Sequence, residues 1–352
     1  MNSLIATARA LMNRGKGLLA MDESVGTCNR RLGEFGIAQT EESRRRYREL
    51  LVTAPGLSDS ISGAILFDET LQQRTQDGVL FIDVLRRNGI LVGIKVDVGA
   101  KALAGHPGER VTEGLDGLRE RLAHYSSLGA RFAKWRAVLA IGDGLPGPAC
   151  TLVNAHALAR YATLCQEAKI VPIVEPEVLM EGVHTLARCG EVTAEVLHHV
   201  FDQCYRQGVI LEAMILKPNM VLPGVSSTEA STLDEIADAT IGCLARAVPA
   251  AVAGVAFLSG GQPAQLATAR LNALNLRTNS SRTVHEVPFP SIPWPLTFSF
   301  GRALQQPALS LWAGCDANRD VAQRALLHRA RCNGAATRGA YRSAMDMEGL
   351  AI

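Results

Sequence analysis

The sequence predicts an α/β protein built as a single (β/α)8 TIM barrel over residues 1–335. Strand-like apolar runs alternate with amphipathic helical runs along almost the whole chain. Eight such strands end about 40 residues apart on average, and a bare βαβ unit needs roughly 30 residues. No shift in composition divides the 352 residues into two domains.

The eight expected strands are nearly continuous apolar runs, which is typical of a parallel sheet covered on both faces. They cover residues 17–21, 61–67, 90–96, 130–135, 170–174, 209–216, 252–258 and 296–300. A doubly wound open sheet is the structural alternative. Its usual GxGxxG fingerprint does not follow the first strand, where the sequence reads AMDESVGT.

The expected helices carry start and stop signals. The N-terminus predicts a short amphipathic helix and has no signal-peptide pattern. A threonine and two glutamates begin the helix expected over residues 40–51. Asn88-Gly89 follows the helix expected over residues 77–87. Gly208 stands where a left-handed glycine ends a helix. The helices expected after the first cover residues 40–51, 77–87, 154–168, 193–207 and 231–247.

Composition excludes several classes of function. With 36 Lys and Arg against 34 Asp and Glu, the net charge is +2, which gives no broad footprint for nucleic acid or an acidic membrane. No apolar run reaches the roughly 20 residues of a membrane helix. The eight cysteines are scattered and contain no CxxC pair, which favours reduced thiols in a cytoplasmic protein. The eight histidines show no zinc-site spacing, so we expect no bound metal.

Polar side chains stand at the C-terminal ends of seven of the eight expected strands, where barrel active sites lie. A lone lysine there is often a structural ion pair. Several lysines and carboxylates at one rim favour function, because isolated buried charges are costly. These strand-end residues are Asp22, Lys95, Asp97, Lys134, Arg136, Glu175, Glu177, Lys217, Ser259, Gly260, Gly261, Ser299, Gly301 and Arg302.

Lys217 is the expected nucleophile. It ends an apolar run, where its ammonium form loses solvation, and a neighbouring cation such as Lys134 disfavours that form further. A partly neutral lysine attacks carbonyl carbon and forms a Schiff base. Glu175 is placed to transfer the protons of this step, with a pKa expected to be pushed toward neutrality, and Asp22 is the second candidate acid or base.

The loops after the last two strands are the usual phosphate site of a barrel. Glycine lets backbone N–H groups approach an anion, and Arg302 adds a charged donor. A Gly-Gly pair alone is more often a turn, but its occurrence together with Arg302 at the correct two strands predicts a phosphate site. Lys95 and Arg31 are expected to hold a second phosphate across the mouth.

Nine motifs follow one another from about residue 4 to about residue 335. They read GKGLLAMDES (15–24), GIKVDVG (93–99), EGLDGL (113–118), FAKWR (132–136), ARYATLCQ (159–166), VPIVEPEVL (171–179), LKPNMV (216–221), FLSGGQ (257–262) and TFSFGRAL (297–304). With these motifs the sequence resembles the class I, Schiff-base fructose-bisphosphate aldolases. The resemblance implies reversible cleavage of fructose 1,6-bisphosphate to dihydroxyacetone phosphate and glyceraldehyde 3-phosphate.

Two alternatives remain open. One is a related Schiff-base aldolase that prefers fructose 1-phosphate or sedoheptulose 1,7-bisphosphate. The other is a non-catalytic barrel that binds sugar phosphates, although such a barrel needs no imine-forming lysine.

The resemblance also implies the role of each residue. Lys217 forms the imine, Glu175 is its acid/base, and Asp22 and Lys134 assist carbon–carbon cleavage. The residues that bind substrate are Ser24, Thr27, Arg31, Lys95, Arg136 and Glu177, with Ser259, Gly260, Gly261, Ser299, Gly301 and Arg302 at one phosphate. The family further implies a cytoplasmic homotetramer of glycolysis and gluconeogenesis that acts on a small phosphosugar and uses no metal or other cofactor.

Two stretches depart from the family pattern. Residues 276–295 are longer than the usual link, rich in Ser and Pro, and expected as a surface loop near the mouth or at a subunit contact. Residues 336–352 are expected to form a mobile tail. The last tyrosine, Tyr341, does not match the terminal tyrosine of many eukaryotic members.

Overall fold

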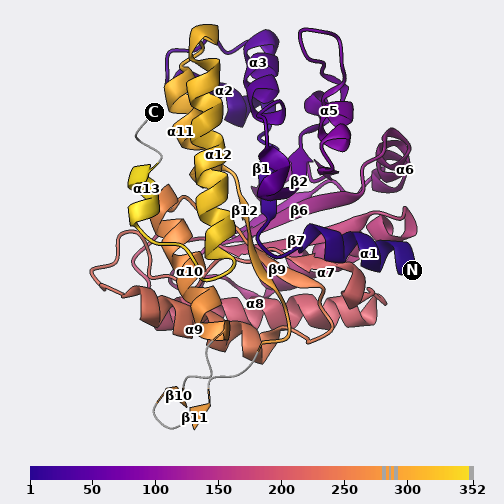
Figure 1. Cartoon of the computed structure of the whole chain (residues 1–352). Helices are drawn as coiled ribbons and strands as arrows, with labels where there is room; N and C mark the ends of the chain where they lie inside the picture. The colour runs from indigo at the N-terminus through magenta and orange to yellow at the C-terminus, as the bar shows by residue number, and fades with distance from the viewer. Residues whose placement is uncertain (280–282, 285–286, 289–291, 349–352) are drawn as a thin grey trace.

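The computed structural model describes the chain except residues 280–282, 285–286, 289–291 and 349–352. Its centre is a closed barrel of eight parallel strands with helices around it (Figure 1). Each barrel strand pairs with the next one along the chain, and β12 closes the barrel against β1. The predicted TIM barrel is confirmed, and the open-sheet alternative is wrong.

All eight barrel strands overlap the predicted runs. Two of them, β6 and β7, continue beyond their expected ends, so Arg136, Glu175 and Glu177 lie within strands. The eight-residue run expected at 209–216 is strand only at its last two residues, and a 3-10 turn at Leu211–Ala213 precedes them. The barrel strands are β1 (Gly17–Met21), β2 (Ile61–Leu66), β3 (Leu91–Lys95), β6 (Phe132–Leu139), β7 (Val171–Val178), β8 (Ile215–Leu216), β9 (Gly254–Phe257) and β12 (Leu296–Phe300). Two small antiparallel pairs lie outside the barrel, β4 (Gly99–Ala102) with β5 (Arg110–Glu113) and β10 (Thr283–Val284) with β11 (Val287–Pro288).

Local sequence signals explain several helix boundaries. Thr40 accepts a hydrogen bond from the Ser43 N–H at the start of α3, and Thr232 with Glu235 forms a capping box at α9. Gly208 is left-handed, with φ 71°, just after α8. The helices are α1 (Asn2–Leu11), α2 (Val25–Gly33), α3 (Glu41–Val52), α4 (Asp68–Gln72), α5 (Phe81–Arg87), α6 (Leu118–Leu128), α7 (Pro148–Glu167), α8 (Leu186–Arg206), α9 (Leu233–Ala247), α10 (Ala264–Asn279), α11 (Arg302–Trp312), α12 (Arg319–Ala336) and α13 (Ala344–Glu348).

The inside of the barrel is apolar at its N-terminal end. Phe132 fills the interior, and a Cβ on Gly93 would lie 2.2 Å from its ring, so only glycine fits there. Leu11 and Met12, from the end of α1, pack into the same cluster and close this end of the barrel. The polar cavity is therefore confined to the opposite end, where the strands terminate.

The described residues differ from the loop expected at residues 276–295 in two respects, while the alternative of a subunit contact stays a prediction. Leu276 lies in the last part of α10 and not in a loop. Residues 292–295 lead into the start of β12, at the end of the barrel away from the mouth, beside Met12 and Lys16. Trp294 is buried there, and its Nε1–H donates to the Pro249 carbonyl at 2.8 Å. Much of the intervening stretch lies outside the described residues.

The described part of the C-terminal segment makes polar contacts with α12, and its expected mobility stays a prediction. Tyr341 is buried, its hydroxyl donates to Asp346 at 2.6 Å, and Asp346 pairs with Arg329 of α12. Residues 349–352 lie outside the described part. None of the helices that the structure describes has the length and apolar character needed to cross a membrane.

Candidate active site

A cavity of about 540 Å³ opens at the C-terminal ends of the barrel strands. Every site residue predicted from the sequence lines it, although those residues come from seven of the eight strand ends and from α2. They are Asp22, Ser24, Thr27, Arg31, Lys95, Lys134, Arg136, Glu175, Glu177, Lys217, Ser259, Gly260, Gly261, Ser299, Gly301 and Arg302. The fold thus brings the predicted site together in one place.

Four charged side chains, three of them buried, form a chain in the centre of this cavity. The Lys134 Nζ lies 2.8 Å from Asp22 Oδ2 and 3.2 Å from Glu175 Oε2. The Lys217 Nζ lies 3.1 Å from Glu175 Oε1. Each lysine therefore has a carboxylate partner, and Glu175 bridges the two lysines.

Strand register explains this arrangement. Val174 pairs with Leu216, so the next residues of those two strands, Glu175 and Lys217, are neighbours at the barrel mouth. Lys134 pairs with Ile173, two residues before Glu175. Alternate residues of a strand share one face, so Glu175 and Ile173 point the same way and the β6 lysine can reach Glu175.

The electrostatics correct one expectation. Burial alone would raise the pKa of Glu175, but Lys134, Lys217 and Arg136 outweigh it and hold this pKa below its ordinary value. Burial would likewise raise the pKa of Asp22, but Lys134 and Lys217 lower it to about 2. The pKa of Lys134 is raised, because its carboxylate neighbours outweigh the effect of burial. The predicted shift of Glu175 toward neutrality is therefore wrong for this arrangement, since two lysines stabilise its charged form.

The loops after β9 and β12 have the features of an anion site. Gly260 and Gly261 have φ of 53° and 83°, a left-handed backbone that favours glycine. Ser299 is buried, and its hydroxyl has no hydrogen-bond partner within the described part of the chain. The α11 helix starts at Arg302 without a side-chain cap, so its first N–H groups are open to an anion.

Across the mouth, the two predicted cations are already paired. Arg31 forms an ion pair with Glu23, and Lys95 lies 2.6 Å from an oxygen of Asp97. Glu23 also pairs with the buried Arg48. These carboxylates hold Arg31 and Lys95 at the edge of the cavity, where they remain among its lining residues.

Comparison with known proteins decides the family. A family model described as fructose-bisphosphate aldolase class-I matches residues 3–350.

The chain belongs to the class I fructose-bisphosphate aldolases.

Several relatives of this aldolase have similar length. A protein of Xanthomonas axonopodis pv. citri, named probable fructose-bisphosphate aldolase class 1, is 51% identical over 96% of this chain and 98% of its own. The cytosolic fructose-bisphosphate aldolase 4 of Arabidopsis thaliana is 49% identical over 96% of this chain and 84% of its own. The solved aldolase of Plasmodium falciparum, in complex with TRAP and a small-molecule inhibitor, is 43% identical and superposes with a TM-score of 0.92. It covers 97% of this chain and 96% of its own.

Sequence reasoning missed some polar residues of the aldolase cavity. Glu23 and Glu181 line it, and Asp97 was noted only as a strand-end residue without a role. Glu23 could have been found, because it directly follows Asp22 at the end of the first strand. Its partners Arg31 and Arg48 lie further along the chain on α2 and α3, and only the fold shows that they converge on it.

Proposed function

We propose that this aldolase cleaves fructose 1,6-bisphosphate reversibly through a Schiff base on Lys217. One observation carries the proposal: the Lys217 Nζ lies 3.1 Å from Glu175 inside a cavity with anion-binding features at one rim and cations at the other. A nucleophilic amine and a proton carrier in hydrogen-bond contact are the groups that imine formation requires.

Glu175 acts first as a base. It accepts a proton from the Lys217 ammonium, and the neutral amine then attacks the ketone carbon of the substrate. A proton passes from the attacking nitrogen to the former carbonyl oxygen and gives the carbinolamine. Loss of that proton removes one of the cations that lower the pKa of Glu175, so the proton is held more firmly once it is transferred. Glu175 then gives the proton to the carbinolamine hydroxyl, which leaves as water, and the iminium remains.

The iminium is the electron sink for cleavage. The bonding electrons of the breaking carbon–carbon bond move into it and give an enamine, while the hydroxyl proton on the departing aldehyde passes to a carboxylate. Asp22, fixed by Lys134 at 2.8 Å, is positioned to receive or direct that proton. Because the iminium does the work of a Lewis acid, the proposal uses no metal or other cofactor.

The two rims would hold the two phosphates. We assign Gly260, Gly261 and Ser299 with the start of α11 to one phosphate, supported by the open N–H groups and the unpartnered hydroxyl. Arg31 and Lys95 serve the other, assisted by Ser24 and Thr27 at the start of α2. A bisphosphate fits two such rims better than a ketose with one phosphate.

Covalent trapping tests the proposal. Borohydride reduction in the presence of dihydroxyacetone phosphate should add one adduct per chain, mapped by mass spectrometry to Lys217. Lys217→Ala should lose both adduct and cleavage, whereas the exposed Lys101→Ala should keep both. An adduct on Lys134 or Lys95 would overturn the assignment, and absence of any adduct would favour the non-catalytic barrel. Cleavage rates on fructose 1-phosphate and sedoheptulose 1,7-bisphosphate decide between the related aldolases.

We also infer a cytoplasmic homotetramer. The inference is supported by family membership and by plant relatives whose names describe them as cytosolic or cytoplasmic. Light scattering on the protein as it elutes from a size-exclusion column measures the mass of the oligomer directly. The mass of a monomer would contradict the inference.

A further inference from the structure

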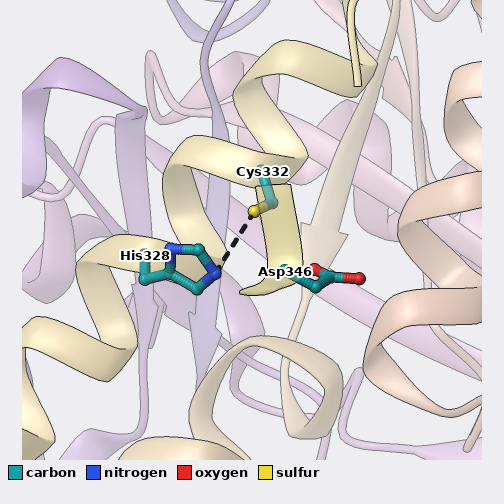
Figure 2. Close-up of side chains that lie close together, drawn as sticks. All are labelled: His328, Cys332 and Asp346. Atoms are coloured by element: carbon teal, nitrogen blue, oxygen red, sulfur yellow. Dashed lines mark hydrogen bonds between the residues drawn. The ribbon is translucent and has the colours of Figure 1, made fainter. Parts of the chain in front are cut away.

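A group of metal-ligating side chains joins α12 to α13. His328 and Cys332 stand on α12, and Asp346 comes from α13 (Figure 2). Each side chain contributes one ligand atom: a ring nitrogen, the sulfur or a carboxylate oxygen. These three atoms lie within 4.8 Å of one another. Among the described residues that line the mouth cavity, these three do not occur, so the group is separate from the aldolase site.

The helix aligns the first two ligands. Residues four apart stand one above the other on a helix, and here the Cys332 Sγ lies 3.7 Å from the His328 Nε2. Zinc binds sulfur at about 2.3 Å and nitrogen at about 2.0–2.1 Å, so two ligands of one tetrahedral ion are about 3.6 Å apart. The pair therefore already has the spacing of two zinc ligands.

The third ligand needs only a small movement. Tetrahedral geometry would place the Asp346 oxygen roughly 3.5 Å from the other two ligand atoms. In the structure, that oxygen lies within 4.8 Å of both atoms. Asp346 accepts from Arg329 through one oxygen and from the Tyr341 hydroxyl through the other. Each carboxylate oxygen has two lone pairs, so both contacts can persist when the carboxylate binds an ion.

Charge and exposure also suit an ion. A thiolate and a carboxylate together balance a divalent charge. His328 and Asp346 are only partly buried, so an ion can enter and water can take the fourth position.

We propose that His328, Cys332 and Asp346 bind one Zn²⁺ ion, which fastens α13 to α12. The sequence shows no zinc-site spacing, because Asp346 reaches the His–Cys pair only through the folding of the C-terminal segment. The ion is structural and takes no part in aldol cleavage, so this proposal stands independently of the proposed function.

Cobalt titration of the full chain tests it. Protein stripped with a chelator and returned to chelator-free buffer should bind one Co²⁺ with a thiolate-to-metal charge-transfer band, and one equivalent of Zn²⁺ should remove the band. Cys332→Ala should abolish the band, and His328→Ala and Asp346→Asn should weaken binding at least about tenfold. Cys315→Ala, which removes the exposed cysteine, is the matched control and should bind normally.

A second measurement tests the fastening. Zn²⁺ should slow tryptic cleavage after the exposed Arg342 at least about tenfold in the natural chain and not in Cys332→Ala. Aldol cleavage should be normal in Cys332→Ala and His328→Ala, which shows that they fold. No charge-transfer band, or the same band in Cys332→Ala, would overturn the site. Zn²⁺ binding that leaves the rate of tryptic cleavage unchanged would overturn the proposal that the ion fastens α13 to α12.

Discussion

Replacement of Lys134 by methionine should destabilise this aldolase mainly through Asp22. Methionine keeps an unbranched side chain of similar length and removes the charge. Lys134 is the nearest cation to Asp22, at 2.8 Å, and both side chains are largely buried. Without it, the pKa of Asp22 should rise, because burial favours the neutral carboxyl and only Lys217 and Lys95 would still lower the pKa.

The size of the effect follows from the pKa. Asp22 is held at about 2 against an ordinary 3.8, and each pKa unit is worth about 1.4 kcal/mol. The stabilisation is therefore about 2 kcal/mol, to order of magnitude. Because the pKa is lowered in the folded state, this contribution is complete above about pH 4 and is lost as the pH falls from about 4 to about 2. At neutral pH, removing one partner of a buried pair should cost about 3–5 kcal/mol in all.

A double-mutant cycle isolates the pair. Urea unfolding at neutral pH would compare Lys134→Met, Asp22→Asn and the double variant, and we expect the double variant to lose about 2 kcal/mol less than the sum of the single variants. The exposed Lys101→Met is the matched control, with a change within about 0.5 kcal/mol. Additive losses, or a Lys134→Met variant as stable as the natural protein, would refute the reasoning.

Three further predictions concern binding, the C-terminus and metal dependence. Arg302→Ala should weaken binding of phosphorylated ketoses about 10- to 150-fold, as expected for a lost charge-assisted hydrogen bond of about 1.5–3 kcal/mol, and equal losses for an unphosphorylated ketose would make Arg302 structural. Deletion of residues 342–352 should change cleavage less than about threefold, but it removes the partner of the buried Arg329, so the unfolding midpoint should fall. A more than tenfold drop in proton exchange on dihydroxyacetone phosphate, with the imine still trapped, would show that the tail participates. Chelators should leave cleavage intact, and inhibition by EDTA that zinc reverses would contradict the Schiff-base mechanism.

The positions of the strands, and the polar residues at their C-terminal ends, could be predicted from the sequence. Near-continuous apolar runs at a regular spacing predict a parallel barrel, because such a barrel buries both faces of its strands. Lys217 and Glu175 each follow or end such a run, and the carboxyl ends of all strands of a barrel meet at one rim. The strand-end members of the site therefore followed from local patterns, whereas Ser24 and Thr27 came only from the family resemblance.

The charged partners of those residues could not be predicted from local patterns. Glu175 lies between two lysines because β7 is flanked by β6 and β8 at a particular register, and this lowers a pKa that burial alone would raise. Arg31 faces Glu23, and Tyr341 reaches Asp346, through contacts between separate elements.

The sequence by itself determined the order of strands and helices and the residues delivered to the barrel mouth, since apolar periodicity and strand ends are local properties. Only the tertiary structure decided which charges pair, which way each pKa moves, and how the C-terminal segment packs on α12. The physical reason is that electrostatic and packing energies depend on distances between groups far apart in the chain, and folding alone sets those distances.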